Sequence, residues 1–203
     1  AALFRFRFAL TLIAGCCALL LVYAFARPIW EPVYLRLAGL NTVSDVLSEF
    51  EGPVRDRLAH DFIEANVNYP PSRLALLAFK REERLELWAQ RESIWVHIRD
   101  YAIKGASGAL GPKLREGDLQ VPEGIYRVSA LHPNSAFHLA LKLNYPNRFD
   151  REKAEQDGRV ELGGDIFIHG GAASIGCIAL GDPSIEEVFV LAAMVRRANI
   201  RVV

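Results

Sequence analysis

The feature that most limits the possible folds of this chain is a series of short strand-like runs from residue 74 onward. Two of them, residues 84–88 and 94–98, alternate apolar and polar side chains as half-buried strands do. Further apolar runs of strand length lie at residues 74–79, 125–131, 137–143, 166–168 and 200–203. Glycines, prolines and charged residues separate the runs, which is the pattern of hairpins and meanders. The sequence therefore predicts a mainly β domain over residues 73–203.

One late segment of this domain has the pattern of a helix. Asp182 is expected to be the N-cap and Pro183 the first helical residue, because proline suits that position. The apolar residues that follow recur at helical spacing and form one face, made of Ile185, Val188, Phe189, Ala192 and Val195. Residues 144–158 are polar and lack such spacing, so we expect a loop there. The predicted domain is thus mainly β with one late helix.

The N-terminal part of the chain contains an uncharged apolar run at residues 8–26. As a helix, this run would span roughly 28 Å, close to the hydrocarbon thickness of a bilayer. Arg5 and Arg7 precede the run, which favours an N-terminus in the cytoplasm and export of the remainder. We expect residues 1–26 to act as an uncleaved membrane anchor. A cleaved signal peptide and lipidation at Cys16 are the alternatives.

Residues 27–72 connect this segment to the predicted β domain. Apolar residues fall at helical spacing within residues 42–67, and Gly52-Pro53 is expected to interrupt the helix there. We interpret residues 27–72 as a helical spacer that docks onto or separates the domain and takes no part in chemistry.

The charge balance of the chain argues against one class of function. Lys and Arg together number 24, as do Asp and Glu, so the formal net charge is zero. Proteins that bind nucleic acid through a basic face carry a clear excess of positive charge. We therefore expect no nucleic-acid partner.

The residues with the clearest chemical potential are His169 and Cys177, which lie in one glycine-rich stretch. Cys16 and Cys17 lie inside the apolar run, so Cys177 is the single thiol of the predicted exported part. An unpaired cysteine outside the cytoplasm indicates an intermolecular disulfide or a reactive thiol. A nearby imidazole activates a thiol by taking its proton. We expect the histidine at the end of one strand, a chain reversal, and the cysteine at the start of the next strand.

Four further residues are candidates for supporting this chemistry. The backbone N–H groups of Gly176 and Cys177 are candidates for an oxyanion hole, and Gly176 has no side chain to crowd an acyl group. Gly170 permits the chain to reverse after the histidine. Ser174 is expected to form a hydrogen bond either within the loop or to substrate. Lys113 is expected either to meet a substrate carboxylate or to be solvated.

A metal site is the main competing interpretation of a Cys/His pair. The predicted exported part lacks a second cysteine, and it contains neither a CxxC nor an HxxxH spacing. We therefore expect no metal and no cofactor, and a purely structural loop is the remaining alternative. His97 and His138 lie in strand-like runs and are expected to be structural, whereas the sequence indicates no partner for His60 and His132.

The stretch around His169 and Cys177 resembles the signature of the YkuD-type L,D-transpeptidases. Residues 168–170 (Ile-His-Gly) and 174–177 (Ser-Ile-Gly-Cys) match its two elements. The loop between them is short, Ile175 stands where many members carry histidine, and Ala179 stands where many carry arginine. The short form is similar to the YafK-like branch of the family. Further similar motifs within residues 73–203 lie at residues 79–88, 108–113, 117–118, 122–124 and 144–147.

The resemblance implies a mixed β-sandwich of the L,D-transpeptidase type and a cysteine acyl-enzyme. Cys177 would attack the carbonyl between an L-centre and a terminal D-residue of a peptidoglycan stem peptide, and His169 would move the proton. An amine acceptor would give a crosslink or a wall-attached protein, and water would give hydrolysis, including release of a wall-linked lipoprotein. A non-catalytic envelope scaffold is the alternative from another class. The expected location is the periplasmic face of the inner membrane, or the periplasm after cleavage.

Overall fold

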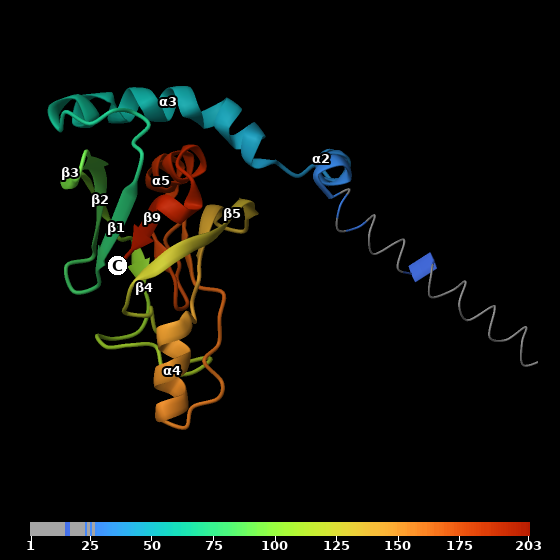
Figure 1. Cartoon of the computed structure of the whole chain (residues 1–203), viewed down its shortest axis with the longest axis vertical. Coiled ribbons are helices and arrows are strands. Elements are labelled where there is room, and N and C mark those ends of the chain that lie inside the picture. The colour runs from blue at the N-terminus through green and yellow to red at the C-terminus, as the bar shows by residue number, and fades with distance from the viewer. Residues whose placement is uncertain (1–14, 17–22, 24, 26) are drawn as a thin grey trace, which may run out of the picture. The chain divides into compact units, whose positions relative to one another are not determined.

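The computed structural model describes residues 15, 16, 23, 25 and 27–203 (Figure 1). The chain divides into two compact units, Ala1–Thr42 and Val43–Val203. The candidate site and the predicted β domain lie in the second unit.

The described part of the first unit contains helix α2 (Arg27–Leu37). Arg27 and Glu31 form an ion pair on this helix, one turn apart. Most of the predicted membrane segment, residues 8–26, lies outside the described residues. Among the residues that are described, no helix combines the length and the apolar character needed to span a bilayer. The anchor therefore stays a prediction.

Within the described residues, nine strands join in one mixed sheet with the order β3-β2-β1-β9-β5-β6-β7-β8-β4. The β1–β9 and β7–β8 pairs are parallel, and the other pairs are antiparallel. Each strand-like run of the sequence corresponds to one of these strands, so the mainly β prediction is confirmed. The strands are β1 (Leu74–Phe79), β2 (Arg84–Arg91), β3 (Ile94–Ala102), β4 (Gly105–Ala106), β5 (Tyr126–Ser135), β6 (His138–Leu143), β7 (Phe167–His169), β8 (Ile178–Ala179) and β9 (Ile200–Val202).

The two halves of the sheet meet at β5, which pairs with different neighbours along its length. Tyr126 and Arg127 pair with β9, and residues from Val128 onward pair with β6. The register shifts between Val128 and Ala130, close to the point where the partner changes. The predicted mixed β-sandwich is therefore observed as one continuous mixed sheet whose halves share a strand.

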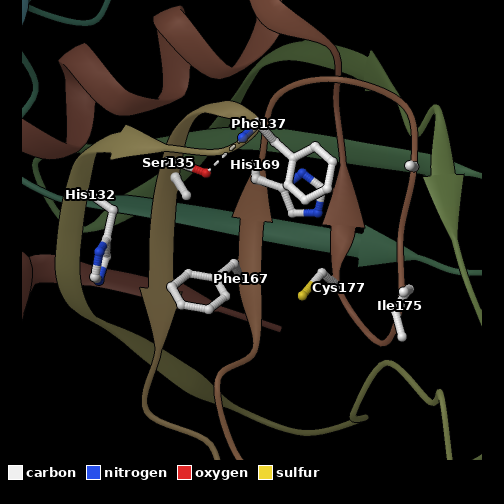
Figure 2. A pocket seen from close by; sticks show the side chains of 9 residues that line it. His132, Ser135, Phe137, Phe167, His169, Ile175 and Cys177 are labelled. Carbon is white, nitrogen blue, oxygen red and sulfur yellow. Dashed lines mark hydrogen bonds between the residues drawn. The ribbon is translucent and has the colours of Figure 1, made fainter.

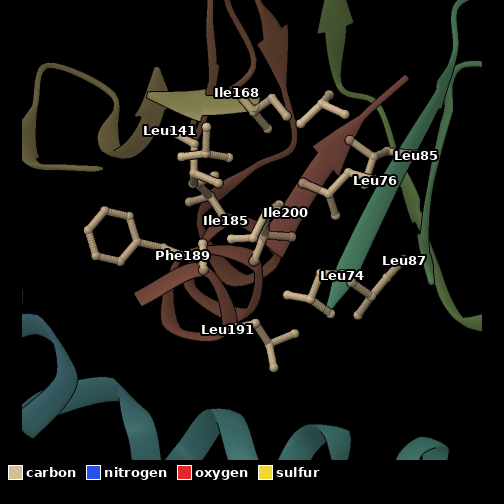
Figure 3. Close-up of a cluster of buried hydrophobic side chains, with 14 of the residues drawn as sticks. Leu74, Leu76, Leu85, Leu87, Leu141, Ile168, Ile185, Phe189, Leu191 and Ile200 are labelled. Atoms are coloured by element: carbon tan, nitrogen blue, oxygen red, sulfur yellow. The ribbon is translucent and has the colours of Figure 1, made fainter. Parts of the chain in front are cut away.

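The hydrophobic core lies between the sheet and helix α5 (Asp182–Met194), as Figure 3 shows. Leucine and isoleucine side chains from β1, β2, β6, β7 and β9 belong to the same core cluster as the apolar residues of this helix. The predicted apolar face of the helix is confirmed, because its members are all buried: Ile185, Val188, Phe189, Ala192 and Val195. The late helix therefore closes the core on one side of the sheet.

The predicted N-cap of this helix is wrong by one residue. Gly181 is the N-cap, and Asp182 is the first helical residue. The Asp182 carboxylate instead accepts a hydrogen bond from the backbone N–H of Gly171 at 2.8 Å. Asp182 therefore ties the start of α5 to the glycine-rich loop rather than capping the helix.

Helix α3 (Val43–Glu64) belongs to the same compact unit and packs against α5. The predicted interruption at Gly52-Pro53 is wrong, since the helix continues through both residues. Proline removes one backbone N–H from a helix. However, apolar residues on both sides of it, including Val46 and Leu58, are buried in the core and hold the two halves in line. The larger part of the predicted spacer is therefore part of the domain's core.

Charged groups reinforce the contact between α3 and α5. The carboxylate of Glu187, which is almost fully buried, accepts from Arg57 of α3 at 2.7 Å and from Arg99 of β3 at 3.0 Å. Arg99 also pairs with Asp61 of α3 at 2.5 Å. A buried carboxylate needs such partners, because unpaired it would carry a large desolvation cost. The network therefore specifies how α3 sits against the sheet and α5.

A further helix, α4 (Arg148–Gln156), lies where the sequence predicts a polar loop. Asn147 is its N-cap, and Asp150 completes a capping box by bonding back to the Asn147 backbone. Ala154 is the buried residue of this helix, so the segment lacks the apolar periodicity that indicates a helix. The prediction of a single late helix in the β domain is therefore wrong.

Candidate active site

His169 and Cys177 come from two adjacent parallel strands. His169 is the last residue of β7, and Cys177 directly precedes β8. The register pairs His169 with Ala179, which places Cys177 across from Phe167. Residues directly across from each other on neighbouring strands point to the same face of a sheet. The predicted strand ends are confirmed, and the reversal in the loop brings the chain back so that both strands run in the same direction.

The face of the sheet that carries these residues borders a pocket (Figure 2). On the next strand, β6, Ala140 lies across from His169 and Lys142 lies across from Phe167. Ile168, between the two pocket residues of β7, points the other way and is fully buried in the core. Alternation along β7 therefore separates a pocket face from a core face.

The pocket has a volume of about 320 Å³. Its walls are mainly aromatic and aliphatic, and its described lining includes no Lys, Arg, Asp or Glu side chain. The lining residues are His132, Ser135, Phe137, Ala140, Phe167, His169, Ala173, Ile175 and Cys177. An uncharged part of a ligand therefore fits beside the sulfur, and charged ligand groups must find their partners at the rim.

Two contacts orient the imidazole of His169, which is 3% exposed. Its Nδ1 lies 2.6 Å from the carbonyl oxygen of Gly170, which can only accept a hydrogen bond. Nδ1 therefore carries the proton of the neutral imidazole, and Nε2 offers the lone pair that accepts a proton from a thiol. The ring also stacks on Phe137, with 4.7 Å between the ring centroids and 28° between the planes. The carbonyl oxygen and the phenyl ring thus fix the orientation of the imidazole.

Cys177 is half-buried, and its Sγ lies 3.8 Å from the backbone oxygen of Asp165. Burial raises the pKa of the Cys177 thiol above its ordinary value, and the Asp165 carboxylate adds to this rise. A hydrogen bond from the Phe167 backbone and the positive charge of Lys113 lower this pKa, but the net direction is upward. The net effect of these surroundings is therefore to disfavour the thiolate form of Cys177.

The hydroxyl groups of two serines hold the backbone at Cys177. Ser174 Oγ donates to the carbonyl oxygen of Cys177 at 2.6 Å and accepts from its N–H at 3.1 Å. The N–H of Gly176 donates to Ser107 Oγ. The expectation that Ser174 bonds within the loop is confirmed. Both amides that the sequence suggests for an oxyanion hole are engaged by hydroxyl groups in this structure, so that role stays a prediction.

The two glycines of the predicted site are required for different reasons. Gly176 has φ of +82°, a left-handed conformation that side chains other than glycine rarely adopt. At Gly170, an added Cβ would lie 2.6 Å from both the Asp182 carboxylate and the Phe137 carbonyl oxygen. Gly170 therefore allows close packing around its carbonyl oxygen, which orients the histidine. The left-handed backbone conformation is by itself a sufficient reason for glycine at position 176, whether or not a side chain there would crowd an acyl group.

The prediction that Lys113 is solvated is wrong, whereas its role in binding a substrate carboxylate stays a prediction. The side chain is buried, and its ammonium group pairs with Asp118 at 2.5 Å and donates to the backbone oxygen of Arg115 at 2.9 Å. Because both partners lie in the same loop as the lysine, its charge serves to fold that loop. Lys113 is therefore not solvated, and its positive charge lowers the pKa of the Cys177 thiol.

Several pocket residues are not identified by the sequence analysis. The sequence could have identified Phe167, because it lies two residues before His169 on the same strand and must share its face. His132 contacts Phe167 edge to face, with 5.3 Å between the ring centroids. Phe137 and Ser107 approach the site from distant segments, and no local pattern indicates their positions.

The described residues include no group of three or more His, Cys, Asp or Glu side chains that could hold a metal ion.

Comparison with known proteins identifies relatives of the β domain. The family model YkuD, described as the L,D-transpeptidase catalytic domain, matches residues 75–200. An Escherichia coli K12 protein named "Putative L,D-transpeptidase YafK" is 36% identical to this chain over 113 residues. The match covers 55% of this chain and 44% of YafK, and YafK of Escherichia coli O157:H7 matches equally. The chain therefore spans less than half the length of these curated relatives.

Solved structures of the helical cell shape determining protein Pgp2 from Campylobacter jejuni share the fold. One has a TM-score of 0.51 at 24% identity and covers 64% of this chain and 46% of Pgp2. A structure of a Pgp2 variant has a TM-score of 0.52 at 22% identity and covers 73% of this chain and 53% of that one. At these identities the likeness concerns the fold alone, and it agrees with the predicted architecture.

Proposed function

Because the chain belongs to the YkuD family of L,D-transpeptidase catalytic domains, we propose that it is a cysteine acyltransferase of peptidoglycan stem peptides. The observation that carries the proposal is that Cys177 and His169 line one pocket from adjacent strands. The orientation of the imidazole supports it further, because Nε2 is the nitrogen left to act as a base. The resemblance of the signature motif supports the choice of substrate.

The first half of the reaction forms a thioester. His169 Nε2 takes the proton of the Cys177 thiol as the sulfur attacks the carbonyl carbon between the L-centre and the terminal D-residue. The carbon–nitrogen bond of the tetrahedral intermediate then breaks, and the imidazolium returns the proton to the leaving amine. The free D-residue departs, and the remaining peptide is esterified to the sulfur. Since the thiol pKa is raised, attack and proton transfer are expected to be coupled.

The second half transfers the acyl group to an acceptor. An amine acceptor loses a proton to His169, attacks the thioester and releases the thiol, which gives a crosslink or a wall-attached protein. Water as the acceptor gives a free carboxylate, either on a trimmed stem peptide or on a peptide freed from a wall-linked lipoprotein. The residues at the site act in the same way in each case, so the masses of the products are what identify the acceptor.

The aromatic and backbone contacts of His169 have a defined role in this scheme. The Gly170 carbonyl stabilises the imidazolium through Nδ1–H, and the stacked ring of Phe137 limits rotation of the imidazole. Both contacts involve parts of the chain next to α5 and the β5–β6 turn. General-base catalysis depends on such positioning, because the proton must be within hydrogen-bond reach.

We also propose the cell envelope as the site of action. The uncharged run at residues 8–26 and the arginines before it support export with retention at the membrane. Fractionation of cells that express the full chain tests this proposal. Recovery in the membrane fraction, with a tag after Val203 exposed to the periplasm, is the expected result, and recovery in the cytosol contradicts it.

The activity is tested by mass spectrometry of the purified protein with stem tetrapeptides. The wild type should gain the mass of the tetrapeptide less its terminal residue, and the Cys177→Ala variant should gain nothing. A carbapenem serves as a second acylating probe. A protein whose accessible Cys177 is modified by neither reagent would be a non-catalytic envelope scaffold, which contradicts the proposal.

Product masses then identify the acceptor. Incubation with muropeptides that offer a free amine separates crosslinked dimers from trimmed monomers, and wall-bound lipoprotein offers the third substrate. The His169→Ala variant provides the matched control, since it keeps the nucleophile and loses the base.

A further inference from the structure

The pocket lacks charged walls, but an ion pair lies at its edge, in line with the nucleophile. Lys142 of β6 is across from Phe167 of β7, and Phe167 is across from Cys177. The three residues therefore form one row over three adjacent strands, with their side chains on the pocket face. The α-carbons of Lys142 and Cys177 are about two strand spacings, or roughly 10 Å, apart.

The partner of Lys142 is Asp165, which precedes β7. The Lys142 ammonium lies 2.5 Å from the Asp165 carboxylate and 5.8 Å from the centre of the Phe167 ring. The backbone oxygen of the same aspartate is the group that contacts the Cys177 sulfur, at 3.8 Å. Asp165 therefore touches the nucleophile through its backbone and the lysine through its side chain.

Structural stabilisation accounts poorly for this pair. The Asp165 side chain is 76% exposed and that of Lys142 is 35% exposed, and ion pairs with such exposure contribute little to stability. Asp165 also adopts φ of +55°, a conformation that is uncommon for residues other than glycine. The pair is thus open to solvent, next to the sulfur, and held by an unusual backbone conformation.

The cation that lowers the pKa of the Cys177 thiol, Lys113, is not available to a ligand. Lys113 influences the Cys177 thiol through its charge, but its side chain is only 6% exposed and is occupied by Asp118. Lys142, which lies over the ring of the pocket residue Phe167, can be reached by a ligand that replaces its exposed partner.

We propose that Lys142 is a specificity-determining residue, which binds a carboxylate of the donor peptide in place of Asp165. The assignment rests on the proposed function, since it concerns the peptide whose carbonyl Cys177 attacks. A peptide residue extends about 3.3 Å, so a carboxylate one residue from the attacked carbonyl, or on the side chain beside it, fits within the row. A hydrogen bond between an ammonium group and a carboxylate is stronger than one between neutral groups, so it can contribute to the choice of substrate.

Two carboxylates of a stem peptide have this chemistry. One is the C-terminal carboxylate of the leaving D-residue, and the other is a carboxylate on the side chain of the residue that supplies the attacked carbonyl. Three donors separate them: a stem tetrapeptide with both carboxylates, its C-terminal amide, and a tetrapeptide with an uncharged side chain at the attacked residue.

The experiment measures kcat/KM for acyl-enzyme formation with each donor, for the wild type, Lys142→Ala and Lys142→Arg. The wild type should prefer the full donor over one of the two altered donors by roughly 10- to 100-fold, the worth of a charged hydrogen bond. The Lys142→Ala variant should lose this preference, so that its kcat/KM with the full donor is as low as its kcat/KM with that altered donor. Lys142→Arg should restore most of the preference, because it keeps the charge.

Lys153→Ala is the matched control, since Lys153 also lies over an aromatic ring but on α4, with no residue of its helix in the pocket lining. It should behave as the wild type, and the melting temperature of Lys142→Ala should stay close to that of the wild type. A Lys142→Ala protein that keeps the wild-type preference, or that loses rate equally with all donors, would overturn the assignment. A wild type that forms no acyl-enzyme with any donor would overturn the proposed function and this assignment with it.

Discussion

In strand β7, Ile168 and His169 are neighbours in the chain but face opposite sides of the sheet. Ile168 is fully buried against α5 and the core leucines, as Figure 3 shows. His169 lies in the pocket, where a carbonyl oxygen and an aromatic ring orient it (Figure 2). The core face is thus defined by the apolar area it buries, and the pocket face by the geometry of a few contacts.

Substitutions on the two faces of β7 should therefore have different effects. A change on the core face leaves a cavity and lowers the free energy of unfolding. A change on the pocket face removes a reacting or orienting group while the core stays packed, so it should lower the reaction rate more than the stability. Four predictions test whether the effects of the two faces are separate.

The largest effect is expected from the reacting groups. Cys177→Ala should abolish acyl-enzyme formation, and His169→Ala should slow it by roughly 10²- to 10⁴-fold, the usual contribution of a general base. Acylation is followed by mass spectrometry, and stability by thermal denaturation. Cys177→Ala should melt close to the wild type because the side chain is half-buried and outside the core. Acylation of Cys177→Ala at the wild-type rate would contradict the assigned nucleophile.

The next effect is on stability and comes from the core face. Ile168→Ala should lower the free energy of unfolding by about 2–5 kcal/mol, and Ile168→Val by about 0.5–1.5 kcal/mol, because each leaves a cavity in proportion to its size. Denaturant unfolding measures both. The folded fraction of Ile168→Val should acylate at nearly the wild-type rate. A large loss of rate without loss of stability would show that the two faces are not separate.

A smaller effect is expected at Phe137, which orients the imidazole without reacting. Stacking of this kind is worth about 0.5–1.5 kcal/mol, so Phe137→Ala should reduce kcat/KM by up to roughly tenfold. Phe137→Tyr should retain the stacking and most of the rate. Phe149→Ala is the control, because Phe149 is an exposed phenylalanine of α4. Equal kcat/KM values for Phe137→Ala and Phe149→Ala would contradict the proposal that Phe137 positions the His169 imidazole.

The smallest effect is electrostatic and concerns the Cys177 thiol. Its pKa is raised by burial and by the Asp165 carboxylate, so thiolate forms above the ordinary range of about 8.5. Removing that negative charge in Asp165→Asn makes the thiolate less unfavourable and should move the alkylation profile with iodoacetamide to lower pH. Asp157→Asn, on α4's C-cap, is the control. An unchanged profile in Asp165→Asn would exclude the carboxylate as a cause of the shift.

The sequence could single out His169 and Cys177 as the proposed reacting pair because the signals for them are local. Thiol and imidazole chemistry follow from residue type, and the strand before His169 is visible as an apolar run. Lys113 shows the limit of this reasoning, since a lysine in a glycine-rich loop looks solvated until Asp118 is seen beside it. Helix α4 shows another limit, because its capping box is present in the sequence but its apolar periodicity is absent.

By itself, the sequence determined which residues could do chemistry, the family signature around them, and the alternation that places His169 and Ile168 on opposite faces. Alternation is a property of a single extended strand and needs no partner. Only the tertiary structure decided that Lys142, Phe167 and Cys177 form one row, and that Phe137 stacks on the histidine. Those relations depend on the register between strands far apart in the chain, which hydrogen bonding and the packing of α5 select together.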